Sequence, residues 1–480
     1  MKLIKKLLFP KQEGVKHTRN YLIGQLFVGK GINVLLSPLT TSELATIGYG
    51  INKAYYSAEG FMEIFVALAL YRGVTRFFYD SKYDRKQMLS TQFQLLMVVM
   101  SLMAAILMLA MPAWRNIANL TVHMAVLVII HSYLQSIIAF YLAYLQAHKK
   151  SEWYASYSSA LAFLSTVIGV ALMYVIKDAP HLGLLYGAVG VRACFAAYAI
   201  FAMRHDIRKP SSKTMRKEVW RFCIPLIPQL FASRILVSSD VMMIDRMVGK
   251  SETGIYGFAD TFGSLITIVT YALNQAWAPE FYDLMDQKQY TVINRRLRYY
   301  FNTLLTVATG IILFSKEAVY VLAGDPDFYP AYSIIPILVY GYLMFYVYTN
   351  LSNYAVYAKK TEFLAITTAI SGLTNISLNF LLIPIYGYQI AAVTTLAAYV
   401  VQYVVYYVFD RFWFHSVVAY QSYPFWKLCI YMLGTYGFFL LFEQWSLPFL
   451  VGIAVKGMAG LAMVALIWLD VSQVSWKKQP

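Results

Sequence analysis

The chain has 480 residues, of which 59% are hydrophobic and only 13% are charged, whereas a soluble domain carries roughly a quarter charged residues. With a mean hydropathy of +0.54, this composition excludes an ordinary soluble domain and predicts a protein that lies in a membrane. The net charge of +16 would suggest nucleic acid in a soluble protein, but no nucleic-acid-binding motif accompanies it, so we expect no nucleic-acid partner.

Apolar runs long enough to cross a bilayer recur along the chain. A transmembrane helix needs about 20 apolar residues, and a helix satisfies its own backbone hydrogen bonds within lipid. Such runs are found at 21–41, 46–71, 88–111, 118–146, 153–176, 182–203, 222–248, 254–280, 299–322, 331–357, 362–384, 388–409, 425–443 and 447–470. They predict an all-α membrane protein with about fourteen transmembrane helices.

A basic stretch at 204–221 is the strongest break in composition. It separates a predicted six-helix bundle at 21–203 from a second bundle at 222–409, and two further helices and a tail follow at 410–480. Residues 1–20 form a basic segment, which we interpret as cytoplasmic and not as a cleaved signal peptide. With this segment inside, most Lys and Arg fall in predicted cytoplasmic loops, so both termini are expected in the cytoplasm.

The two predicted halves show a weak internal repetition. Each opens with a basic segment and then reaches a Gly-Tyr turn, at 46–50 in the first half and at 253–257 in the second. Two related bundles around a central cavity are a common plan for transporters. Gly-Tyr turns are also frequent at membrane interfaces, so both interpretations of the turns stay open.

The sequence carries none of the motifs that would indicate a catalytic site. Cys194, Cys223 and Cys429 are isolated and lie in or beside apolar runs, so neither a disulfide nor a metal site is expected. No Walker A loop, metal-ligand cluster or nucleophile elbow is found. We therefore expect a transport protein and not an enzyme, with no cofactor.

Several stretches resemble the polysaccharide transporter family of Wzx-type flippases, in the superfamily that also holds the MATE multidrug exporters and the lipid II flippases. They are 36–50, 72–78, 224–228, 239–240, 254–257, 275–279 and, most specific, 375–388 with 391–395. One departure is Val241, because many relatives place Arg directly after the aspartate that is Asp240 here.

The resemblance implies a MATE-like fold, with two pseudo-symmetric bundles around a central cavity. It also implies that the protein flips a polyprenyl-pyrophosphate-linked oligosaccharide from the cytoplasmic to the outer leaflet of a bacterial inner membrane. The oligosaccharide would be a repeat unit of O-antigen, capsule or exopolysaccharide. Its expected partners are this lipid, the bilayer, and a polymerase with other glycan-assembly proteins.

Basic side chains within and beside the predicted spans are candidate substrate contacts, since charge in lipid is costly and is usually placed at a cavity or a partner. Arginine binds phosphate through two parallel hydrogen bonds, and lysine offers a point charge. A cationic route for pyrophosphate would use Arg192, Arg234, Lys30, Lys53, Arg72 and Arg76. Arg192 and Arg234 lie near mid-span in different halves, so one pyrophosphate could contact both. Salt bridges within the membrane are the alternative, and Arg72 and Arg76 could be cytoplasmic anchors.

Acidic side chains in the spans are candidates for ion coupling. Glu59 and Glu63 lie one turn apart, and a close pair of like charges favours binding of a proton or Na⁺. The alternative is that each pairs with Lys30 or Lys53. Asp240 and Asp260 are weaker candidates.

Two other functions are compatible with parts of the sequence. A MATE-type exporter of small molecules coupled to a cation would share the fold, but the basic centre is unsuited to cationic drugs. A membrane glycan polymerase or glycosyltransferase would need a large external loop with catalytic residues, and every predicted external loop is short.

Overall fold

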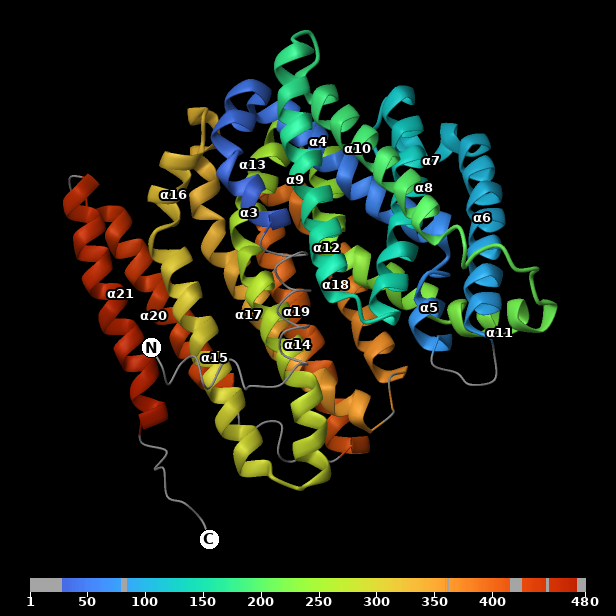
Figure 1. Ribbon diagram of the computed structural model, residues 1–480. Helices are drawn as coiled ribbons and strands as arrows, with labels where there is room; N and C mark the ends of the chain where they lie inside the picture. Colours follow the sequence, from blue (N-terminus) through green and yellow to red (C-terminus); the bar gives the residue numbers. More distant parts are fainter. Residues whose placement is uncertain are drawn as a thin grey trace. The chain divides into compact units, whose positions relative to one another are not determined.

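The computed structural model describes residues 28–78, 84–358, 360, 362–414, 425–445 and 449–472. The predicted basic segment at 1–20 and the C-terminal end therefore lie outside the described residues. Throughout the described part the regular structure is helical, without a β-strand, which confirms the all-α prediction. Close contacts divide the chain into two compact units (Figure 1).

Unit 1 comprises the described residues up to Gly257 together with Ile383–Tyr388. Its helices are α3 (Val28–Leu35), α4 (Ser37–Ala67), α5 (Arg72–Phe77), α6 (Arg85–Leu109), α7 (Met111–Ile117), α8 (Val122–Ala147), α9 (Ser151–Val175), α10 (Pro180–Met203), α11 (Lys213–Cys223), α12 (Leu226–Met247) and the first part of α13 (Lys250–Gly263). The unit thus extends past the basic stretch 204–221 and includes α12. The predicted bundle boundaries at 21–203 and 222–409 stay a prediction.

Helix α4 continues through residues 42–45, which separate the predicted spans 21–41 and 46–71. The helix has 31 residues and contains one break, at Ala45, where φ is 48° and ψ is −174°. It ends where Leu68 and Ala69 adopt left-handed φ values of 43° and 58°, a conformation that costs non-glycine residues energy and stops the helix. The chain thus bends at a single residue between the two predicted spans and is helical on both sides of it.

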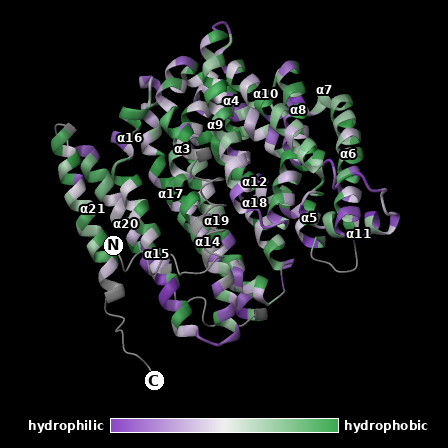
Figure 2. Ribbon diagram, in the orientation of Figure 1, coloured by the Kyte–Doolittle hydropathy of each residue, from purple (hydrophilic) through white to green (hydrophobic). Residues whose placement is uncertain are grey.

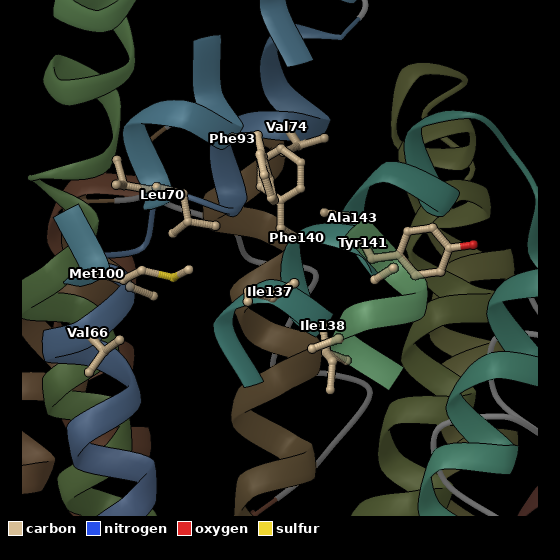
Figure 3. Packing of buried hydrophobic residues seen from close by; sticks show 14 of the residues in the cluster. Val66, Leu70, Val74, Phe93, Met100, Ile137, Ile138, Phe140, Tyr141 and Ala143 are labelled. Atoms are coloured by element: carbon tan, nitrogen blue, oxygen red, sulfur yellow. The ribbon is translucent and has the colours of Figure 1, made fainter. Parts of the chain in front are cut away.

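The core of unit 1 lies between α4, α5, α6 and α8. Figure 3 shows Val66, Met100 and Phe140 among the side chains that meet there. The rings of Phe93 and Phe140 contact edge to face, with centroids 5.3 Å apart. Because lipid tails are as apolar as these side chains, close packing and not transfer out of water holds such helices together.

The basic stretch 204–221 forms an amphipathic helix, α11, preceded by a segment fixed to α6. The buried side chains of α11 are Met215, Val219 and Cys223, which share one face at intervals of four residues. Lys209 donates to Asp84 at 2.8 Å. This hydrogen bond and one from the backbone N–H of Gln87 hold the pKa of Asp84 below its usual value.

Unit 2 comprises the described residues from Phe258 on, without Ile383–Tyr388. After the end of α13 it contains α14 (Leu265–Asp286), α15 (Tyr290–Leu313), α16 (Ser315–Leu322), the 3₁₀ helix η2 (Pro326–Ser333), α17 (Ile335–Tyr357), α18 (Glu362–Tyr386), α19 (Ile390–Phe409), the π-helical η3 (Asp410–Phe414), α20 (Phe425–Gln444) and α21 (Phe449–Ser472).

A few polar contacts attach the apolar helix α21 to its neighbours. Figure 2 shows α21 as mostly hydrophobic, whereas α11 carries many hydrophilic residues. The side-chain amide of Asn302 on α15 donates to the carbonyl of Ile467 at 2.8 Å. Lys456 forms a 2.7 Å ion pair with Glu317 on α16, and both side chains are mostly buried. In lipid such contacts fix the register of a helix whose outer face offers no specific packing.

Eight described helices are long and apolar enough to cross a membrane, or up to ten if each of two bent helix pairs is one span. The bent pairs are α15 with α16, at 60°, and η2 with α17, at 48°. The chain is therefore a multi-pass membrane protein, but the expected count of fourteen is not confirmed. Predicted span 21–41 begins outside the described residues, and span 254–280 is divided at Ser264 between α13 and α14.

Candidate functional site

Two acidic side chains lie near the end of α4, within a predicted membrane span, where a charged group is costly unless it has a partner or a function. Glu59 and Glu63 stand one helical turn apart, as the sequence predicted. Glu59 is 8% exposed, and within the described part of the chain its Oε1 has no hydrogen-bond partner. Its backbone carbonyl accepts from the hydroxyl of Ser132 on α8 at 3.3 Å, which holds this turn of α4 against α8. A buried carboxylate oxygen without a donor is costly unless it binds a proton or a cation.

Arg234 brings the positive charge of α12 to this acidic turn. Its Nη2 lies 3.9 Å from Oε2 of Glu63, a long ion pair whose side chains are 30% and 19% exposed. The guanidinium fits because residue 60 is glycine: a Cβ there would lie 2.2 Å from the Cζ of Arg234. The hydroxyl of Ser57 donates to the carbonyl of Ser238 at 2.7 Å, which fixes α4 and α12 in this register.

Arg192 approaches the same acidic turn from α10, but its hydrogen bonds go to neutral groups. Its Nε donates to Oε1 of Gln135 at 3.3 Å, and Nη1 donates to the carbonyl of Ala188 at 3.1 Å. A weaker contact joins Nη1 to the hydroxyl of Ser165 at 3.5 Å. Among the described residues, no carboxylate lies within ion-pair distance of Arg192. Its charge is therefore held in place without being neutralised by direct contact.

These four residues form one electrostatic cluster, called here the arginine–glutamate cluster: Glu59, Glu63, Arg192 and Arg234. Arg192 and Arg234 are near enough for their charges to interact with both carboxylates. All four residues belong to unit 1. Helix α12 packs with α4 inside unit 1, and the expected assignment of the two arginines to different bundles stays a prediction. Two guanidinium groups beside two carboxylates can exchange an internal ion pair for a bound phosphate.

The other basic candidates have different surroundings. Lys53 is half-buried on α4, with its Nζ 5.4 Å from the ring centroid of Tyr49 and its side chain against Gly257. Arg72 is exposed, and its charge interacts with Glu63. Arg76 is exposed on α5 beside the ring of Phe77. Lys30 belongs to α3, and its side chain lies outside the described residues.

Each of the two aspartate candidates accepts a hydrogen bond from a tyrosine hydroxyl. Asp240 is buried on α12 and accepts from the hydroxyl of Tyr256 at 2.9 Å. Asp260 belongs to unit 2 and accepts a hydrogen bond from the hydroxyl of Tyr342. The carboxylate at ion-pair distance from Arg234 is that of Glu63.

Sequence reasoning missed the polar face of α8 that supports the cluster. Ser132 and Gln135 contact Glu59 and Arg192, and the neighbouring His131 is buried with its Nδ1 3.1 Å from the hydroxyl of Tyr55. The available signal was a run of polar residues at 131, 132, 135 and 136, which return to one face of an otherwise apolar helix. No group of three or more His, Cys, Asp or Glu side chains able to hold a metal ion occurs in the described ranges.

The amino-acid sequence is similar to two protein families and to a bacterial protein. Residues 18–285, more than half of the chain, match the family described as Polysaccharide biosynthesis protein, and residues 225–381 match the family MatE. A Haemophilus influenzae protein, Lsg locus putative protein 1, is 23% identical over 301 residues, which are 61% of this chain and 72% of that protein.

Solved structures share the fold over most of the chain. The inward closed conformation of the lipid II flippase MurJ superposes with a TM-score of 0.71 at 16% identity, covering 93% of this chain and 98% of that one. An outward-facing multidrug resistance MATE family transporter superposes with a TM-score of 0.55 at 13% identity, covering 86% and 97%. At these identities the likeness shows the fold alone, and it confirms the MATE-like architecture.

Proposed function

The chain belongs to the polysaccharide biosynthesis protein family, and from this premise we propose that it flips a polyprenyl-pyrophosphate-linked oligosaccharide. The direction is from the cytoplasmic to the outer leaflet of a bacterial inner membrane, with both termini of the protein in the cytoplasm. Two solved proteins of the same fold are named as a flippase and a transporter, in agreement with the prediction of a transport protein and not an enzyme.

The observation that supports the proposal is that, among the described residues, neither arginine of the arginine–glutamate cluster forms a short ion pair with a carboxylate. Arg234 makes one ion pair at 3.9 Å, which is longer than the 2.7–2.9 Å of a strong charged hydrogen bond. Arg192 is hydrogen-bonded to neutral oxygens. Both side chains therefore keep donors for a phosphate group. A pyrophosphate headgroup offers the oxygens that such planar donors bind in pairs.

Substrate binding would change the partner of Arg234. As phosphate oxygens replace Glu63 at the guanidinium, the released carboxylate lies one turn from the buried Glu59. Two adjacent carboxylates repel each other until one takes up a proton or both share a cation. We propose that Glu59 and Glu63 couple transport to H⁺ or Na⁺ in this way. Lys53 and Arg72 would extend the basic route on either side of the cluster along the chain.

A MATE-type exporter of small molecules is the second candidate, supported by the MatE match over residues 225–381. An exporter of cations needs a site with surplus negative charge. In the arginine–glutamate cluster two arginines balance two glutamates, and Arg72 adds a further positive charge near Glu63. This charge balance favours an anionic substrate.

Deletion of the gene tests the proposal. The deletion strain should lose its surface glycan, while lipid-linked repeat units accumulate in the cytoplasmic leaflet. Leaflet position is measured by digestion of intact spheroplasts with a glycosidase that does not cross the membrane, with lysed spheroplasts as the control. A strain that no longer makes the lipid-linked unit would place the protein among the synthases. Normal surface glycan with accumulated cationic dye would favour the MATE-type exporter.

A further inference from the structure

Unit 2 carries a continuous row of aromatic rings built from α16, η2 and α20, called here the aromatic strip. Its members are Tyr329, Tyr320, Tyr332, Phe439 and Tyr436. The rings of Tyr329 and Tyr320 stack with centroids 4.1 Å apart and an interplanar angle of 25°. Successive centroids along the rest of the strip are 6.5, 6.3 and 6.0 Å apart. The row therefore links three elements, and the ring of Phe439 within it is buried.

Charged groups border the aromatic strip. The hydroxyl of Tyr332 donates to the carboxylate of Glu443, which is exposed on α20. The Nζ of Lys316 on α16 lies 5.6 Å from the centroid of the Tyr332 ring. Tyr320 is 42% exposed, so part of its ring is open to a ligand although its other contacts are aromatic. The strip thus combines an accessible ring with a hydrogen-bond acceptor and a donor.

This combination matches the surface chemistry of a sugar. A pyranose ring presents polarised C–H groups on one face, which pack against the negative face of an aromatic ring. Hydroxyl groups around its edge can donate to a carboxylate and accept from an ammonium group. A lipid acyl chain would pack against the rings equally well, but it has no groups that hydrogen-bond to Glu443 or Lys316.

We propose that the aromatic strip binds the glycan portion of the substrate on the outer side of the membrane. The inference rests on the proposed function and on the expected topology, in which the segment between spans 299–322 and 331–357 is external. Pyrophosphate recognition and glycan recognition are then assigned to different units of the chain.

The competing interpretation is that Tyr320 is an ordinary interfacial tyrosine, as are many aromatic residues at membrane surfaces. The chain supplies a matched comparison. Tyr174 lies near the predicted external end of α9 and is 41% exposed, almost the same as Tyr320. It has no ring partner among the described residues. A purely interfacial role predicts equal consequences for the two positions, whereas sugar binding predicts different ones.

The test uses full-length protein in lipid nanodiscs and the oligosaccharide released by mild acid from the lipid-linked intermediates of the host. Binding is measured by saturation-transfer NMR and titration. Tyr320→Leu, which keeps bulk and removes the aromatic face, should weaken binding roughly threefold to tenfold. Tyr320→Phe should bind as the wild type, and so should the control Tyr174→Leu. Equal thermal unfolding of all variants checks that the fold is kept.

Three outcomes would overturn the inference: no binding to the wild type, unchanged binding in Tyr320→Leu, or equal losses in Tyr320→Leu and Tyr174→Leu. Labelling of Asp327→Cys with a maleimide that does not cross the membrane checks separately that this segment is external. The proposed function fails on different evidence, namely normal glycan export in the deletion strain. Sugar binding at the strip and flipping by the protein can thus be rejected independently.

Discussion

The partner of a single arginine decides how the interior charges should be interpreted. Asp240 follows Arg234 by six residues on the same helix, so it would be one candidate partner for an internal salt bridge. In the structure Asp240 accepts from Tyr256, and Glu63 on another helix is the residue near Arg234. An internal salt bridge for stability and a phosphate site for transport would both use this pair. They differ in what happens when its two members are removed together.

Arg234→Ala should abolish flipping, or reduce it roughly tenfold to a hundredfold, while the protein still folds and inserts. The physical reason is that the substrate loses charged hydrogen bonds that alanine cannot replace. Arg234→Lys should restore part of the activity, because lysine keeps the charge and loses the paired donors. The measurement is a flipping assay in proteoliposomes at matched protein levels.

The double variant Arg234→Ala with Glu63→Gln separates the two interpretations. If the pair serves only to neutralise charge, removing both members should restore activity, since no carboxylate is left unpaired. An active double variant would therefore exclude contact between Arg234 and the substrate. Gly60→Ala offers a version that changes no charge: its Cβ would displace the flexible guanidinium and not the backbone. We expect it to lower activity with little change in thermal stability.

Part of the cluster could be predicted from the sequence, because helical periodicity places Glu59 and Glu63 on one face. Costly charge in apolar runs also identified Arg192 and Arg234 as site candidates. Which residues pair could not be predicted. The pairing depends on how α4, α8, α10 and α12 pack. It also depends on Gly60, whose missing side chain leaves room for the guanidinium of Arg234, a contact between two helices that the sequence does not show.

At the scale of elements, a close backbone approach in unit 1 joins the N-terminal part of α4 to the start of α13. A Cβ at Gly50 would lie 1.8 Å from the carbonyl oxygen of Lys250, and one at Gly254 would lie 2.0 Å from the carbonyl oxygen of Thr46. The hydroxyls of Thr46 and Ser251 lie 2.7 Å apart beside this contact. The Gly-Tyr turns noticed at 46–50 and 253–257 are thus the two surfaces of one helix–helix contact.

Gly50→Ala should destabilise unit 1, because the added methyl group meets backbone atoms that cannot move without shifting a helix. The expected cost is about 1–3 kcal/mol, measured as a lower thermal unfolding temperature in detergent. Gly190→Ala on α10 is the matched control, since a Cβ there has nothing within 4 Å. It should be neutral or stabilise by up to about 1 kcal/mol through helix propensity. Equal effects of the two changes would show that backbone proximity is not what Gly50 provides.

The apolar runs located most helices correctly, because a span must be apolar over its length whatever it packs against. Their ends and breaks were less predictable. The break in α4 lies at Ala45, where no Gly or Pro marks it, and the division between α13 and α14 lies at Ser264. Both depend on how neighbouring helices constrain the backbone, which a single sequence does not record.

At the scale of the whole molecule, the compact units do not follow the composition of the chain. The basic stretch 204–221 is the strongest break in sequence, yet α11 and α12 belong to unit 1 with the helices before them. Composition reports which side of the membrane a loop occupies, through the positive-inside rule. The contacts between helices, in contrast, show which helices belong to the same compact unit. Topology therefore has to be tested by a measurement that does not depend on helix packing.

Reporter fusions give that measurement. Fusions ending after residue 211 or at Pro480 should fluoresce with green fluorescent protein and be inactive with alkaline phosphatase, because both points are expected in the cytoplasm. A fusion after Asp327 should show the opposite pattern. With the N-terminus in the cytoplasm, an even number of crossings must precede residue 211 and Pro480, and an odd number must precede Asp327. An external signal at residue 211 would change the orientation of every later loop and place the aromatic strip in the cytoplasm. A cytoplasmic signal there, with an external Asp327, requires an odd number of crossings between them, as in the three spans expected at 222–248, 254–280 and 299–322.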